Sequence, residues 1–136
     1  MTTHLGLGVM LRHLCGNTDT VNAIKESFGK KIVGLKLEDN KLYMTFADKT
    51  GIYFWDNGQS CCEHRYMHTD DDLEYHVGGK FKDVEVADGP EGEDQYGEMK
   101  ECQFLKITTT KGVFTMANYN EHNGYYGGFA IEAVRC

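Results

Sequence analysis

The residues most suggestive of chemistry in this sequence lie close together in one short stretch. Residues 56–68 read DNGQSCCEHRYMH, in which two adjacent cysteines are followed by two histidines. Thiolate and imidazole are common zinc ligands, and a structural zinc site requires four ligands. A histidine much later in the sequence is a remote candidate for the last position. We therefore predict a structural zinc ion, whose ligands are Cys61, Cys62, His64 and His122.

Other interpretations of the same residues compete with zinc binding. The sequence lacks the second cysteine pair of a typical zinc site, and isolated cysteines are often ordinary buried side chains. A disulfide between Cys61 and Cys62 would need strained geometry and is disfavoured in the reducing cytoplasm that we expect. The dipeptides Glu63-His64 and Glu121-His122 suggest acid-base or metal chemistry, although neighbours on a strand point to opposite faces. The enzyme alternative is a small metal-dependent hydrolase that uses Cys62, His64, Glu121 and His122.

Negative charge is concentrated in two parts of the chain. The formal net charge of the 136 residues is -7, and the segment 83–98 contains seven acidic residues with no Lys or Arg. A second acidic group, Asp70–Asp72, precedes it. A solvated loop is the plain interpretation, but such a face also suits a basic protein partner. The residues predicted to bind this partner are Asp70, Asp71, Asp72, Glu91, Glu93 and Asp94.

Other classes of partner are disfavoured by the composition. Phosphate contacts need clustered Lys and Arg, so we do not expect direct binding to nucleic acid. No run of eighteen apolar residues is present, so we expect no membrane-spanning segment. No phosphate loop, dinucleotide motif or nucleophile elbow is present either. We therefore predict no catalytic residue, and the sequence leaves the oligomeric state undetermined.

Two parts of the sequence resemble each other. The segment GKKIVGLKLEDN (29–40) aligns with GGKFKDVEVADG (78–89), and residues 42–58 align with residues 104–120. In each part an expected short helix ends at a glycine that can adopt the left-handed conformation. Alternating apolar residues and turn signals then predict three strands. We predict an α+β fold of two related helix-plus-three-strand meander units, packed as one domain with pseudo-two-fold symmetry.

The expected organisation is a single domain, 1–136, with an N-terminal extension at 1–18. The first repeat occupies 19–58 and opens with a helix at Asp19–Phe28. The second repeat occupies 70–124 and opens with a helix at about Asp70–His76. An acidic insertion at about 89–101 separates the first two strands of the second repeat, and a last strand at 129–135 closes the chain.

The chain resembles a family of small phage-encoded proteins of uncharacterised function. The resemblance covers about residues 20–135 and depends on a GKKI-type strand, a G-x-x-CCE element and a KG…NGYY element. The matching residues are Gly29–Ile32, Gly58 to Glu63, Lys111-Gly112 and Asn123–Tyr126. His64 and the acidic loop are less typical of the family, so the resemblance does not imply zinc binding through His64.

The resemblance implies a phage or prophage origin and action in the host bacterial cytoplasm. Small acidic phage proteins of this type resemble inhibitors of host defence, including anti-CRISPR proteins. The expectation is a non-catalytic inhibitor that binds a basic surface of an RNA-guided type II nuclease and blocks DNA loading or cleavage. A phage structural or assembly module is a further alternative.

Overall fold

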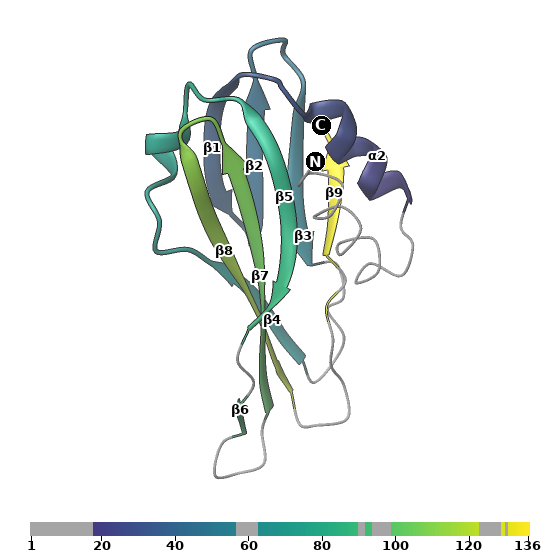
Figure 1. Ribbon diagram of the computed structural model, residues 1–136. Helices are drawn as coiled ribbons and strands as arrows, with labels where there is room; N and C mark the ends of the chain where they lie inside the picture. The colour runs from purple at the N-terminus through teal and green to yellow at the C-terminus, as the bar shows by residue number, and fades with distance from the viewer. Residues whose placement is uncertain (1–17, 57–62, 90–91, 94–98, 123–128, 130) are drawn as a thin grey trace.

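In the part of the chain that the structure describes, the protein is mostly β-structure, arranged as two antiparallel sheets with one α-helix beside them (Figure 1). The computed structural model describes residues 18–56, 63–89, 92–93, 99–122, 129 and 131–136. No helix in this described part is long and apolar enough to cross a membrane.

The first sheet has four strands in the order β1-β2-β3-β9. Their bounds are β1 (Ile32–Glu38), β2 (Lys41–Phe46), β3 (Gly51–Asp56) and β9 (Ile131–Arg135). Asp39 and Asn40 form the β1–β2 turn, both with positive φ (52° and 59°), as a tight hairpin turn requires. The helix α2 (Thr18–Ser27) lies beside β9, where the backbone N–H of Ala133 donates to Thr20 Oγ1 at 3.2 Å.

The second sheet has the order β4-β8-β7-β5, and the short β6 pairs with β7. The bounds are β4 (Glu63–His68), β5 (Phe81–Asp88), β6 (Gly92–Glu93), β7 (Met99–Thr109) and β8 (Gly112–His122). A four-residue 3-10 helix, η1 (Leu73–His76), lies between β4 and β5. Strands β7 and β8 continue past the end of the first sheet (Figure 1).

The two sheets are joined by backbone hydrogen bonds between residues 29–32 and residues 78–81, a region that we call the junction. Gly29 N–H donates to the carbonyl of Phe81 at 2.7 Å, and Phe81 N–H donates to Lys30 at 3.0 Å. The carbonyl of Ile32 accepts from Gly78 at 2.8 Å, and Ile32 N–H donates to Gly79 at 2.8 Å. Gly29 and Gly78 both have positive φ (83° and 97°), a conformation that glycine adopts without steric cost.

The hydrophobic core lies between the sheets and is centred on aromatic side chains. Phe81 is fully buried. Its ring centroid lies 5.0 Å from that of Phe28 and 6.4 Å from those of Phe46 and Phe54. Phe46 and Phe54 come from the first sheet and Phe81 from the second. The core therefore holds the two sheets together as one body.

The predicted α+β fold of two repeat units with pseudo-two-fold symmetry is wrong. Only the first of the two expected helices is an α-helix; the second is reduced to η1. Each sheet also includes a strand from outside the predicted repeats, because β9 completes the first sheet and β4 completes the second. The aligned segments share hairpins and left-handed glycines. These features are local, so they do not require each segment to form its own helix-plus-strand unit.

The failure of the second helix has a local cause. Aspartate side chains favour caps and turns over helix interiors because they bond to nearby backbone groups. Asp72 Oδ1 accepts from the backbone N–H of Glu74 at 3.1 Å and caps η1. The three aspartates therefore precede the helical turn instead of forming its first turn.

Removing the ring of Phe81 is expected to destabilise the protein strongly. Because this side chain is fully buried among three other rings, Phe81→Ala should lower the free energy of unfolding by about 3–5 kcal/mol. The matched control is Val113→Ala, at a side chain 57% exposed, which should change it by less than about 0.5 kcal/mol. Denaturant unfolding of both variants measures the difference, and equal effects would contradict the placement of Phe81 at the centre of the core.

Candidate functional site

The carboxylates predicted to bind a partner fall in two places. Asp70, Asp71 and Asp72 are exposed in the connection between β4 and η1. Glu91 and Asp94 lie outside the described residues, and of Glu93 the structure describes only its place in β6. The candidate site is therefore built on residues 70–74, which we call the acidic segment; its carboxylates are Asp70, Asp71, Asp72 and Glu74.

Hydrogen bonds to β8 hold the acidic segment in place. Thr69 Oγ1 donates to the carbonyl of Thr115 at 2.8 Å, and Thr115 N–H donates to Asp71 Oδ2 at 2.7 Å. Strand β4 pairs with β8 only as far as His68 and Ala117. The side chains of Thr69 and Asp71 thus satisfy the backbone of β8 where strand pairing ends, which fixes the position of the neighbouring carboxylates.

The far end of the acidic segment is anchored by a buried histidine. His76 is 5% exposed, its Nδ1 lies 2.9 Å from Thr109 Oγ1, and its ring centroid is 4.8 Å from that of Phe114. Burial lowers the pKa of His76, so its imidazole is neutral at pH 7. Its neighbour Tyr75 is 61% exposed. Residues 70–75 therefore present several carboxylates and one phenol ring on a fixed backbone.

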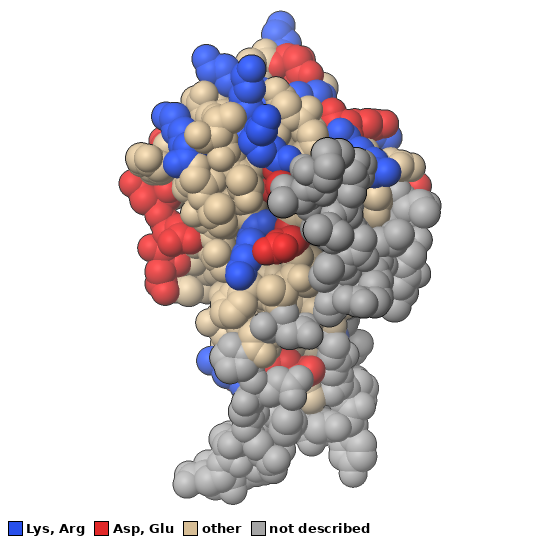
Figure 2. Space-filling view, viewed as in Figure 1, with Lys and Arg blue, Asp and Glu red and all other residues tan. Residues whose placement is uncertain are grey.

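Acidic side chains are concentrated along one edge of the surface (Figure 2). Figure 2 shows acidic side chains gathered along one edge of the molecule and basic side chains at one end. Lys31 and Lys80 are partners in an isolated backbone bridge between the two sheets, and Lys49 and Lys111 lie in the β2–β3 and β7–β8 turns. From Tyr66 to Gly79 the sequence has no Lys or Arg. The stretch of chain that contains the acidic segment therefore contributes no Lys or Arg to the surface.

The residues predicted to bind zinc are only partly described. Cys61 and Cys62 lie outside the described residues. His64 is opposite Glu121 in the β4–β8 register, whereas His122 is opposite Glu63. Because directly opposed residues share a face and neighbours do not, His64 and His122 lie on opposite faces of the sheet.

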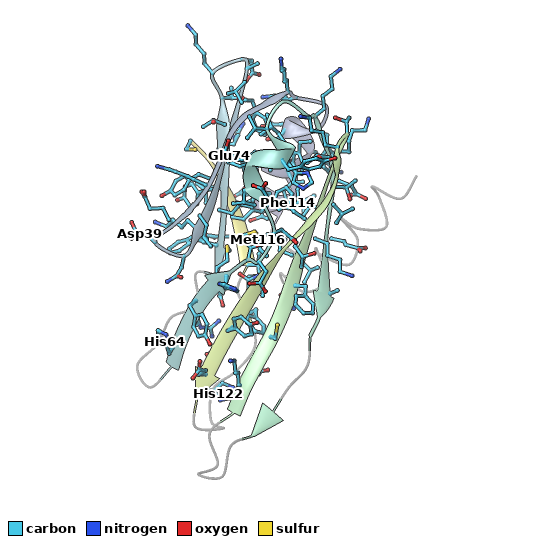
Figure 3. The ribbon with its side chains drawn as sticks, turned by 90° about the vertical axis from the view of Figure 1, so that its left-hand side faces the viewer. Asp39, His64, Glu74, Phe114, Met116 and His122 are labelled. Carbon is cyan, nitrogen blue, oxygen red and sulfur yellow. The ribbon has the colours of Figure 1, made fainter. Side chains whose placement is uncertain are left out.

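The two histidines also differ in their surroundings (Figure 3). His64 is exposed, and its ring centroid lies 4.9 Å from that of Tyr66. His122 is buried, with Nε2 2.7 Å from Glu101 Oε1. One ion would not bind both histidines in this register. Within the described part of the chain, no group of three or more His, Cys, Asp or Glu residues is arranged to hold a metal. Zinc binding stays a prediction.

The inward face of the second sheet changes from apolar to polar along its strands, which sequence reasoning missed. The inward side chains of β8 are first Phe114 and Met116, and then Asn118, Asn120 and His122, all of them buried. Buried polar groups are costly unless they are hydrogen-bonded. Asn118 Nδ2 donates to the carbonyl of Gln103 on β7 at 3.2 Å. The sequence signal that predicts this polar row is the placement of Asn118, Asn120 and His122 at alternate positions in the stretch MANYNEH (116–122).

A buried ion pair links the two sheets near this polar row. Arg65 on β4 donates to both carboxylate oxygens of Asp56, the last residue of β3, at 2.9 Å. Their side chains are 7% and 8% exposed. Asp56 and Arg65 lie on either side of Cys61 and Cys62 in the sequence. The sequence did not identify either residue as a member of an ion pair.

The outward face of the same sheet carries a row of aromatic side chains. The Tyr66 and Tyr119 rings are stacked with centroids 5.0 Å apart, and Lys100 Nζ lies 4.7 Å from the Tyr119 centroid. The Tyr66 hydroxyl donates to Glu121 Oε2 at 2.5 Å. Burial and this carboxylate together raise the pKa of Tyr66 to about 12. Burial also raises the pKa of the Cys102 thiol, so Cys102 is a poor nucleophile at neutral pH.

Breaking the ion pair between the sheets is expected to be costly. Arg65→Met removes the cation that neutralises the buried Asp56 and should lower the free energy of unfolding by about 3–5 kcal/mol. Adding Asp56→Asn should recover much of this loss, because the buried charge is then absent. A double-mutant cycle in denaturant unfolding measures the coupling, and additive effects of the two changes would contradict a buried pair.

The hydroxyl of Tyr66 is expected to ionise unusually late. A tyrosine in water ionises near pH 10, whereas Tyr66 should stay protonated until about pH 12. Glu121→Gln removes the carboxylate that raises the pKa and should move it part of the way back, because burial remains. Titration followed by ¹³C-tyrosine NMR, with Tyr66→Phe to assign the signal, measures the value. A measured pKa near the usual tyrosine value of about 10 would contradict a buried Tyr66 hydroxyl bonded to Glu121.

Comparison with known proteins places the chain in a family without assigning it an activity. Residues 25–131 match the family model described as a domain of unknown function (DUF7448). Neither the curated proteins nor the solved structures contain a match. The matched residues extend from α2 to the first residue of β9 and include the acidic segment. Because the match spans most of the chain, the protein belongs to the DUF7448 family.

Proposed function

We propose that this protein is a phage-encoded, non-catalytic inhibitor of a host defence nuclease of the anti-CRISPR type. It binds a basic surface of the nuclease through the acidic segment and blocks DNA loading or cleavage. The observation that carries the proposal is the acidic segment itself, which presents exposed carboxylates beside the exposed Tyr75 on a backbone fixed at both ends. The phage origin and the class of target come from the resemblance of the GKKI, CCE and NGYY elements.

The physical argument for binding concerns charge and rigidity. An RNA-guided nuclease holds nucleic acid in a positively charged channel, so a compact negative surface competes for the same cations. Complementary charge speeds association and selects the partner. A surface that is already ordered loses little conformational entropy on binding. Bonds from Thr69 and Asp71 to Thr115, with the buried His76, provide this order.

The hydrolase alternative receives less support. It requires Cys62, His64, Glu121 and His122 to act together, yet His64 and Glu121 lie on the face of the sheet opposite to His122. Glu121 accepts from Tyr66, and His122 contacts Glu101. The structure thus separates the described members of that set into two environments.

Charge reversal in the acidic segment is expected to weaken inhibition. The test variant is Asp70→Lys/Glu74→Lys, since the Asp70 side chain is 94% exposed and the Glu74 residue is exposed. Asp71 and Asp72 are left unchanged because they hold the backbone. In DNA-cleavage assays with guide-loaded type II nucleases, the unmodified protein should inhibit. The variant should need at least about tenfold more protein, equivalent to about 1.4 kcal/mol of binding free energy.

The matched control carries the same change in net charge away from the segment. Glu26→Lys/Glu38→Lys alters exposed residues on α2 and β1, both outside the second sheet. This control should inhibit almost as well as the unmodified protein, and inhibition should weaken as salt is added. Equal loss in both variants would remove the role of the acidic segment. No inhibition of any type II nuclease by the unmodified protein would overturn the proposed target.

A further inference from the structure

A groove on the outward face of the second sheet lies directly beside the acidic segment. Its volume is about 270 Å³, and its walls include two aromatic rings, two short side chains and two carboxylates. The residues that matter for its chemistry are Asp70, Asp71, Phe104, Thr115, Ala117 and Tyr119.

The hollow results from the order of large and small side chains on two paired strands. Thr115, Ala117 and Tyr119 alternate along β8 on the outward side, and Phe104 of β7 is the partner of Ala117. The short side chains of Thr115 and Ala117 leave space between the rings of Phe104 and Tyr119. The floor of the groove is therefore formed by β7 and β8, and one side is formed by the connection that follows β4.

The acidic segment closes one side of this groove and gives it negative charge. Asp71 is held there by its bond to the backbone of Thr115, and the side chain of Asp70 is 94% exposed. No Lys or Arg lines the groove. Lys106, the partner of Thr115, is on the same face but is not among the lining residues. An aromatic hollow with a carboxylate rim matches a cation on an apolar stem.

We propose that the groove binds a single arginine side chain of the basic partner. The inference rests on the proposed function and names the group that the acidic segment holds. A guanidinium lays its flat face against an aromatic ring and directs its N–H groups to a carboxylate. The volume is below the range of about 300–1,000 Å³ typical of small-molecule sites, which favours one side chain as the occupant.

Two neighbouring contacts bear on this assignment. The Tyr119 ring already stacks on Tyr66 and has Lys100 Nζ 4.7 Å from its centroid, so the ring against which a guanidinium lies is that of Phe104. His68 Nε2 lies 2.8 Å from Asp70 Oδ1 and is the group with which an arginine competes. The His68 side chain is 56% exposed, so it can turn away into solvent when an arginine binds.

The direct test uses the intact protein and a small probe. The probe is N-acetyl-arginine amide, added to ¹⁵N-labelled protein near neutral pH. The amide signals of Thr69, Asp71, Thr115 and Ala117 should shift and saturate. N-acetyl-citrulline amide, which has the same shape without the charge, and N-acetyl-lysine amide should each bind at least about tenfold more weakly, because neither combines charge with a planar fork.

A pair of matched variants locates the binding. Ala117→Leu fills the groove and should abolish the shifts, whereas Ala47→Leu, at an exposed residue between β2 and β3, should leave them unchanged. The NMR spectrum itself reports whether each variant is folded. Absence of saturable shifts, equal binding of the lysine probe, or retained binding in Ala117→Leu would each overturn the inference.

The outcome is distinguishable from that of the proposed function because no nuclease is present in the titration. Loss of arginine binding with full nuclease inhibition by Ala117→Leu would overturn the groove as the docking site and leave the acidic segment in place. Arginine binding with no inhibition of any nuclease would support the groove and redirect the search to another basic partner.

Discussion

The junction between residues 29–32 and 78–81 fixes how the two sheets are placed against each other. Four backbone hydrogen bonds of 2.7–3.0 Å join the two sheets there. Two glycines with positive φ allow the chain to turn into this arrangement without steric cost. The junction directs Phe81 into the core, where it contacts rings of the first sheet. It also sets where η1 lies, because η1 ends two residues before Gly78.

The acidic segment owes its position to this framework. Its far end is tied to β7 through the contact of the buried His76 with Thr109, and its near end is tied to β8 through Thr69 and Asp71. Two of the aspartates therefore serve the structure, Asp71 by bonding Thr115 and Asp72 by capping η1. Asp70 and Glu74 remain on the surface. Of the four carboxylates in the acidic segment, two therefore hold the backbone in place, and the other two are left for contacts at the surface.

The second sheet presents different chemistry on its two faces. Near the junction its inward face is apolar and packs on the first sheet through side chains such as Phe114 and Met116. Farther along, the inward positions become Asn118, Asn120 and His122, which are buried and polar. The outward face carries Tyr66, Tyr119 and Phe104. Because alternate residues of a strand face opposite sides, one sequence segment supplies both surfaces.

The local elements of this protein can be predicted from its amino-acid sequence. The helix near residues 18–27, the glycine that ends it, the Asp39-Asn40 turn and most strands follow from periodicity and turn chemistry. The concentration of acid at residues 70–74 was also evident. The three-dimensional structure, in contrast, was needed to show that β9 joins the first sheet and β4 the second. It also decided that His64 and His122 face apart, that Asp56 meets Arg65, and that Phe104 and Tyr119 flank a groove beside Asp70. Local propensity is read over a few residues, whereas strand pairing and side-chain clusters depend on contacts between residues far apart in the chain.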